Sequence, residues 1–250
     1  MADRSQIEWT DATWNPVTGC TKVSSGCDNC YAERFSERFR GVKGHPFENG
    51  FELTLRPERL DQPLAWKKPR MIFVNSMSDL FHKDIPVDYI ARVFDTMERA
   101  DRHTFQVLTK RSSLLRNFVN TRYLGSKAPR HIWLGVSVES PKVLVRLEHL
   151  KQTSASMRFV SFEPLLAPMG KLKLSGIDWA IVGGESGYGA RPIEPAWVRE
   201  LRDECLEQGV TFFFKQWGGR TPKAGGNTID GRQWLDFPGI GPTELETVPA

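Results

Sequence analysis

Short apolar runs alternate with amphipathic segments along most of this chain. Six runs rich in Val, Ile, Phe and Trp are continuous enough to form parallel strands that are buried on both faces. They cover residues 70–76, 103–110, 131–139, 157–164, 178–186 and 210–218. The intervening segments place apolar residues three and four positions apart, which predicts helices. These segments are 86–100, 112–122, 141–152 and 194–209. The alternation predicts an α/β fold with a mainly parallel sheet.

The two ends of the chain extend this pattern. Residues 12–17 predict a first strand, a loop with several cysteines follows it, and residues 31–39 predict the next helix. The tail is rich in Gly, Pro and Thr and predicts an ordered arm. Because no internal repeat or linker interrupts the chain, we expect one domain, with a body over residues 1–219 and a C-terminal arm or tail over 220–250.

Polar residues collect where each apolar run ends. A single such residue is typical of a strand end or a helix cap, but six runs ending in the same way favour a functional site. In a parallel barrel the carboxyl ends of the strands share one rim, where catalytic loops lie. The residues at these ends are Asn75, Ser76, Asp79, Thr109, Lys110, Ser137, Glu139, Glu163, Gly183, Gly184, Glu185, Lys215 and Gln216.

Composition narrows the class of protein. Hydrophobic and charged fractions of 40% and 26% are ordinary for a soluble globular protein. The first residues are charged and carry tryptophan, and no later run is long enough to span a bilayer, so we expect a cytoplasmic protein with no membrane partner. The net charge of +4 is modest, and the basic runs at 67–70 and 110–113 are short, which predicts a solvated surface for them.

Three of the four cysteines lie within eleven residues, as Cys20, Cys27 and Cys30. In a reducing compartment such a group indicates metal binding or chemistry rather than disulfides. A structural zinc site usually needs four ligands, and Cys205 resembles a buried apolar residue on a helix. A [4Fe–4S] cluster on three cysteines leaves one iron open to a cofactor, as in radical S-adenosylmethionine enzymes. Both metals remain open on these grounds.

Several motifs in order carry a resemblance to a known family. The chain resembles the bacterial and phage three-cysteine-motif family, a family of unknown function that is similar to radical S-adenosylmethionine proteins. The resemblance covers residues 7–219 and rests on WNPVTGC, GCDNCYAERF, NSMSDLFH, FQVLTKR, WLGVSVES, RFVSFEPLL, WAIVGGESG, ARPIEP and FFFKQWG. It implies a partial (β/α)6-type barrel over residues 1–219, a [4Fe–4S] cluster on the three clustered cysteines, and a phage-related role in DNA repair.

The cysteine spacing departs from that of the wider superfamily. The usual signature is C-x3-C-x2-C, and here the first gap is three residues longer. The superfamily's Gly-Gly-Glu normally follows the second strand, but here it occurs at 183–185, and residues 75–79 take its place. Hydroxyls and a carboxylate in 75–79 can accept hydrogen bonds from the cofactor's ammonium, and the later glycines can let backbone approach its adenine. The expected S-adenosylmethionine-binding residues are Ser76, Ser78, Asp79, Ser137, Glu139, Gly183, Gly184 and Glu185.

Three further residues are expected to act at the mouth of the barrel: Lys110, Glu163 and Lys215. A lysine can bind a carboxylate or phosphate, and a carboxylate can orient ribose hydroxyls or transfer protons. Trp217 is expected at the rim, where a base could stack on it. Two other tryptophans lie inside apolar runs and are expected in the core: Trp133 and Trp179. The isolated histidines are expected at the surface or at caps.

Two functions follow from these features. The first is an iron–sulfur enzyme of the radical S-adenosylmethionine type that acts on a nucleobase in damaged or modified DNA and receives electrons from a donor protein. The alternative is a non-catalytic protein in which zinc or an iron–sulfur cluster stabilises a nucleic-acid-binding surface. Converging polar strand ends favour the enzyme, because a binding module does not need them.

Overall fold

The computed structural model describes residues 5–221 and 223–239. Its strands are β1 (Ala12–Trp14), β2 (Val17–Thr18), β3 (Thr54–Leu55), β4 (Met71–Val74), β5 (Thr104–Thr109), β6 (Ile132–Ser137), β7 (Met157–Phe162), β8 (Trp179–Gly183), β9 (Thr211–Gln216), β10 (Thr228–Ile229) and β11 (Arg232–Gln233). Its α-helices are α1 (Tyr31–Glu37), α2 (Gln62–Ala65), α3 (Val87–Arg99), α4 (Ser112–Arg122), α5 (Val145–Lys151) and α6 (Pro195–Glu207). Short 3-10 turns occupy Ser25–Cys27, Pro57–Arg59 and Pro141–Val143.

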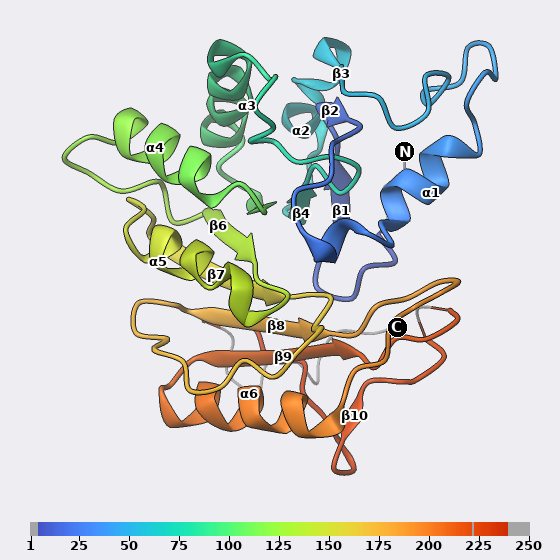
Figure 1. Cartoon of the computed structure of the whole chain (residues 1–250). Coiled ribbons are helices and arrows are strands. Elements are labelled where there is room, and N and C mark those ends of the chain that lie inside the picture. Colours follow the sequence, from blue (N-terminus) through green and yellow to red (C-terminus); the bar gives the residue numbers. More distant parts are fainter. Residues whose placement is uncertain (1–4, 222, 240–250) are drawn as a thin grey trace. The chain divides into compact units, whose positions relative to one another are not determined.

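Seven of these strands form one sheet in the order β1-β4-β5-β6-β7-β8-β9 (Figure 1). The pairings of β1 with β4, β4 with β5, β5 with β6, β7 with β8 and β8 with β9 are all parallel. The predicted α/β class with a mainly parallel sheet is therefore confirmed.

The chain's internal contacts divide it into two compact units. The first unit comprises Met1–Val136 and Arg146–Met157, and the second comprises Ser137–Val145 and Arg158–Ala250. The predicted boundary between a body and an arm at residue 219 is not one of these divisions and stays a prediction.

The core of the first unit lies between its parallel strands and helices α3 and α4. Helix α3 buries Ile90, Val93, Phe94 and Met97 along one face, because these positions are three or four residues apart. Phe94 packs against Phe118 of α4, with their ring centroids 4.9 Å apart. The predicted helices at 86–100 and 112–122 therefore form as expected, and their apolar faces build this core.

The second unit is built on β7, β8 and β9, with α6 lying against β9 (Figure 1). Its largest fully buried side chain is Trp179, whose ring contacts Phe159, Phe213 and Phe237. The indole of Trp179 also donates a 3.0 Å hydrogen bond to the carbonyl of Asp236. The described part of the predicted arm, residues 220–221 and 223–239, is thus attached to the core of this unit. Residues 240–250 of that arm lie outside the described residues.

Three sequence-based expectations about burial are wrong. Trp133 is only half-buried rather than in the core, although its neighbours on β6, Ile132 and Leu134, are both buried. Arg111, in a basic run expected to be solvated, has a side chain that is only 9% exposed. Of the surface or cap positions expected for the histidines, the surface position is wrong for His82 and His103, which are buried at 2% and 1% exposure. A polar side chain can be buried where the fold supplies its partners, which the local pattern does not reveal.

Replacing Trp179 with alanine should destabilise the second unit by about 3–5 kcal/mol, because it removes a fully buried indole and leaves a cavity. The free energy of unfolding can be measured by urea denaturation followed by circular dichroism. Leu206→Ala is the matched control, since Leu206 is 51% exposed and its truncation removes little buried surface. Equal destabilisation by the two substitutions would contradict the packing described here.

Candidate functional site

The cysteine loop, residues 20–30, follows β1 and β2 in the first unit. It begins after Gly19, whose φ of 81° is in the left-handed region that favours glycine. A Cβ at this position would collide with the carbonyl of Glu52, so the close approach of these two backbones also requires glycine. The loop contains a 3-10 turn at Ser25–Cys27, and Cys30 is the N-cap of α1. Sequence and backbone geometry together therefore fix where the loop starts and ends.

The start of the loop is attached to the segment that follows β4. The amide of Gly19 donates to the carbonyl of Met77 at 3.0 Å, and the Ser78 hydroxyl donates to the carbonyl of Gly19 at 2.7 Å. Asn15 accepts a 2.9 Å hydrogen bond from the Met77 amide and exchanges hydrogen bonds with the Ser76 hydroxyl. The Ser78 hydroxyl thus helps to hold the start of the cysteine loop and the Ser76 hydroxyl binds Asn15, while their predicted contact with a cofactor stays a prediction.

Asp79 lies at the centre of a buried hydrogen-bond network. Its Oδ1 accepts from the Thr109 hydroxyl at 2.6 Å and from the Phe81 amide at 3.0 Å. Its Oδ2 accepts from the Lys110 amide at 3.2 Å and from Arg111 Nη1 at 2.9 Å. The carboxylate therefore connects the ends of β4 and β5 and is neutralised by Arg111, while its predicted contact with a cofactor ammonium stays a prediction.

The Arg111 guanidinium bridges Asp79 and the cysteine loop. Its Nη1 lies 3.4 Å from Cys20 Sγ, and its Nη2 donates to the Thr21 carbonyl and hydroxyl at 2.9 and 3.1 Å. The Thr21 hydroxyl is also 2.8 Å from His82 Nε2. Because His82 Nδ1 accepts from the Asp84 amide, its neutral ring carries the proton on Nε2 and donates to Thr21.

Neighbouring groups shift the pKa of Cys20 in opposite directions. Burial and the neighbouring Asp79 carboxylate raise the pKa of Cys20, and the Arg111 guanidinium opposes them by favouring the thiolate. Burial lowers the pKa of His82, and the positive charge of Arg111 adds to that effect. His82 is therefore neutral at physiological pH, which is the form able to make the hydrogen bond described above.

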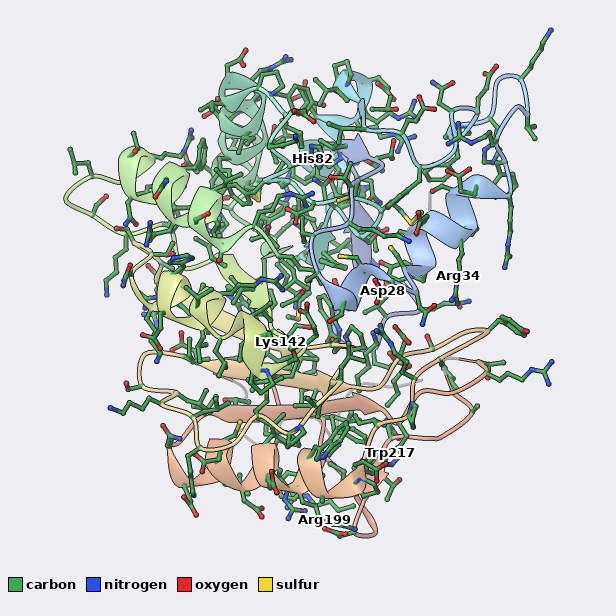
Figure 2. All side chains as sticks on the ribbon, viewed as in Figure 1. Asp28, Arg34, His82, Lys142, Arg199 and Trp217 are labelled. Carbon is green, nitrogen blue, oxygen red and sulfur yellow. The ribbon has the colours of Figure 1, made fainter. Side chains whose placement is uncertain are left out.

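Cys27 and Cys30 are partly exposed free thiols, as is Cys20. The far side of the loop is joined to α1, where Arg34 donates a 2.7 Å hydrogen bond to the Asn29 side chain. Figure 2 shows Arg34 on α1 and Asp28 in the loop beside it. Tyr31, the first residue of α1, is 54% exposed and its hydroxyl donates to the Ser76 carbonyl. Both ends of the loop thus have contacts that hold it.

The donor set of the loop suits a sulfur-liganded iron group. Three thiols with no disulfide provide soft ligands, which favour iron–sulfur clusters over hard cations. In residues 5–221 and 223–239, no group of three His, Cys, Asp or Glu side chains is gathered closely enough to hold a single metal ion. A cubic cluster binds each thiolate at a different corner, so it does not need three ligands converging on one point. Cys205 lies in α6, where burial raises its pKa to about 12, and the prediction of an apolar role for it is confirmed.

The second unit holds another set of predicted residues at the ends of its strands. Lys215 forms an ion pair with Glu163, with 2.9 Å between Nζ and Oε1, and the Ser161 hydroxyl donates to Glu163 Oε2 at 3.1 Å. A Cβ on Gly183 would lie 2.9 Å from Glu163 Oε1, so glycine leaves room for the carboxylate. The structure therefore brings together Glu163, Gly183 and Lys215 at the ends of β7, β8 and β9.

Gly184 and Glu185 form the second part of this set. The backbone carbonyl of Trp217 lies against Gly184 where a Cβ would be, which fills the space that the sequence offers to an adenine. Glu185 is 7% exposed and binds Arg191 through both carboxylate oxygens, at 2.6 and 3.0 Å. Trp217, labelled in Figure 2, is half-buried, and its indole donates to the Thr228 carbonyl at 2.9 Å. These contacts join β8, β9 and the arm.

The remaining predicted residues have different environments. Ser137 and Glu139 are buried at 3% and 0% exposure, and the Glu139 carbonyl accepts a 2.9 Å hydrogen bond from Leu166. Lys110 is half-buried, and its ammonium forms no hydrogen bond or ion pair with the residues that the structure describes. Lys110 is thus a cation at the end of β5 whose side chain is available to a ligand.

Sequence reasoning missed several residues of these networks. Arg111 lies in the FQVLTKR motif, and its place one residue after a polar strand end was the signal that it belongs to the site. Asn15 lies in the WNPVTGC motif, one residue after the end of β1, and Arg191 lies in the ARPIEP motif. His82 ends the NSMSDLFH motif, whereas no local signal identifies Thr21, whose contact with His82 joins residues 61 positions apart.

Replacing Gly184 with alanine should destabilise the second unit by about 1–3 kcal/mol or more, because the added methyl must displace the Trp217 backbone. Ser186→Ala is the control, since it changes a nearby side chain without adding an atom at the crowded point. Thermal unfolding compares the two variants. An unchanged unfolding temperature in Gly184→Ala would show that the two strand ends do not approach as described.

Comparison with known proteins supports a family of unknown function, and the resemblance to radical S-adenosylmethionine proteins stays a prediction. No helix in the described part of the chain is both long and apolar enough to cross a membrane. No curated protein and no solved structure matches the chain. One family model, described as a protein of unknown function (DUF5131), matches residues 4–238. Since the match covers nearly the whole chain, this protein belongs to the DUF5131 family.

Proposed function

We propose that this protein is an iron–sulfur protein and an enzyme of the radical S-adenosylmethionine type. Cys20, Cys27 and Cys30 would hold a [4Fe–4S] cluster, and the iron without a cysteine would bind S-adenosylmethionine. The observation that carries this proposal is the cysteine loop itself, which has three free thiols, one of which, Cys20, lies beside the carboxyl ends of β4 and β5. Such a cluster, when bound and reduced, supplies single electrons to its cofactor.

Residues beside the loop have chemistry that suits this cofactor. The hydroxyls of Ser76 and Ser78 donate to Asn15 and Gly19, and each oxygen keeps lone pairs that can accept from an ammonium. The Lys110 ammonium has no partner among the described residues and can bind the cofactor's carboxylate or a substrate phosphate. Their role would be to orient the cofactor rather than to react.

The second unit, considered by itself, has groups able to move protons. Glu163 and Lys215 are 2.9 Å apart, with side chains 14% and 23% exposed, so the pair is shielded but reachable. A carboxylate and an ammonium in such contact can exchange a proton with a bound substrate. We infer general acid–base roles for these two residues.

The proposed substrate is a nucleobase in damaged or modified DNA, with a separate protein as electron donor. In the first unit Lys110 offers a cation for a phosphate, and in the second unit the half-buried Trp217 offers an aromatic side chain. The alternative is a non-catalytic nucleic-acid-binding protein stabilised by zinc or a cluster. The buried Asp79 network and the shielded Glu163–Lys215 pair favour an enzyme, because a surface for a nucleic acid backbone needs neither.

Protein purified and reconstituted without oxygen should contain about four iron and four sulfide per chain, as a cubic cluster requires. Iron and sulfide assays, with absorption spectra, measure this directly. Cys20→Ala, Cys27→Ala and Cys30→Ala should each lose both elements, whereas Cys205→Ala should keep them because Cys205 is buried in α6. Stoichiometric zinc without sulfide in the same preparation would contradict the proposal and support the alternative.

Addition of S-adenosylmethionine should change the electron paramagnetic resonance spectrum of the reduced protein, because the cofactor would bind the open iron. Ser76→Ala should require a higher cofactor concentration for the same change, since it removes an acceptor for the ammonium. Ser126→Ala, in an exposed turn of the same unit, is the control. A spectrum that stays constant at saturating cofactor would leave an iron–sulfur protein without this cofactor.

A further inference from the structure

We propose that Arg111 is the positioning residue for the Cys20 thiolate and that its hydrogen bond makes an iron group on the cysteine loop easier to reduce. This inference rests on the proposed function, since it concerns the group that the loop would hold. It assigns a role to a residue that no motif of the chain identifies as a ligand. The inference rests on the hydrogen bonds of the Arg111 guanidinium.

Arg111 uses its planar guanidinium in two directions. Nη1 has two hydrogens and two acceptors, Asp79 Oδ2 at 2.9 Å and Cys20 Sγ at 3.4 Å. Nη2 likewise has two acceptors, the Thr21 carbonyl and hydroxyl. A rigid fork of donors can satisfy all four at once, whereas a lysine ammonium, with three donors, cannot. The residue is therefore matched to this position by geometry as well as by charge.

The position of the guanidinium is itself fixed. The side chains of Arg111 and Asp79 are each 9% exposed, so their ion pair is largely shielded from water. Asp79 is held in turn by the Thr109 hydroxyl and by the backbone amide of Phe81. Because the hydrogen bonds to the Asp79 carboxylate come from residues that follow β4 and from residues at the end of β5, these strand ends fix where Arg111 meets Cys20.

A donor at a ligand sulfur has a defined effect on redox chemistry. Hydrogen bonds to cysteine sulfurs stabilise the more negative, reduced form of an iron–sulfur group and raise its reduction potential. The change is a one-electron reduction by the electron donor, with no bond made or broken. Because Asp79 offsets the charge of Arg111, the effect rests on the N–H···S hydrogen bond to Cys20.

Hydrogen–deuterium exchange on the metal-free full chain tests the positioning role without any cluster. Arg111→Lys keeps a positive charge for Asp79 but loses donors to Cys20 and Thr21, so amides at 20–23 should exchange several-fold faster. Arg122→Lys is the matched control, since Arg122 makes a similar multiple pair with Asp95 and Glu98 in the same unit, away from the cysteines. Unchanged exchange at 20–23 in Arg111→Lys would overturn the positioning role.

Potentiometric titration of the reconstituted protein, followed by electron paramagnetic resonance, tests the redox role. Arg111→Lys should shift the midpoint potential to a more negative value at unchanged iron content, and Arg122→Lys should not. The double variant Asp79→Asn with Arg111→Gln removes both buried charges together, which avoids leaving an unpaired carboxylate, and should shift the potential in the same direction.

An unshifted potential in both variants would overturn the redox role and leave the proposed function intact. A wild-type chain that takes up no iron or sulfide would overturn the proposed function, and with it the redox role. The exchange measurement would still decide whether Arg111 positions the loop, so the two failures are distinguishable.

Discussion

The buried ion pair between Asp79 and Arg111 is the interaction on which the candidate site in the first unit depends. Removing a charge from water is costly, and the cost is offset only when every lone pair and N–H group has a partner. Here the partners come from the end of β4, the end of β5 and the cysteine loop. The need to satisfy one carboxylate and one guanidinium therefore brings together three segments that are far apart in the sequence.

Close backbone approach has the corresponding role in the second unit. Gly184 lies against the Trp217 carbonyl, and Gly218, with a φ of 80°, lies against the Glu185 carbonyl. Any larger residue would separate the ends of β8 and β9 and displace the Glu163–Lys215 pair beside them. In this unit glycines allow the strand ends to approach closely, which keeps the Glu163–Lys215 pair in place. In the first unit the charged pair of Asp79 and Arg111 has the corresponding role.

The sequence predicts the fold more fully than the site. Strands such as β5 and helices such as α3 follow from local apolar periodicity, which depends on neighbouring residues. The contacts of Arg111 span up to 91 positions and depend on tertiary structure, so the local charge pattern favoured a solvated surface although Arg111 follows a polar strand end. The same limit applies to the Gly-Gly-Glu motif. Its glycines suggest room for a ligand, whereas the structure fills that space with the protein's own backbone.

Most cations near the strand ends are paired with carboxylates, and this pairing helps to distinguish an enzyme from a nucleic-acid-binding module. Proteins that bind nucleic acid mainly through phosphates need several cations free to replace counterions. Here Arg111 pairs with Asp79, Lys215 pairs with Glu163, and Arg191 pairs with Glu185. Cations paired in this way stabilise buried carboxylates and orient them, which is what a reaction centre requires. If a nucleic acid is the partner, it is therefore expected to present one base to this chemistry rather than to lie along an extended basic surface.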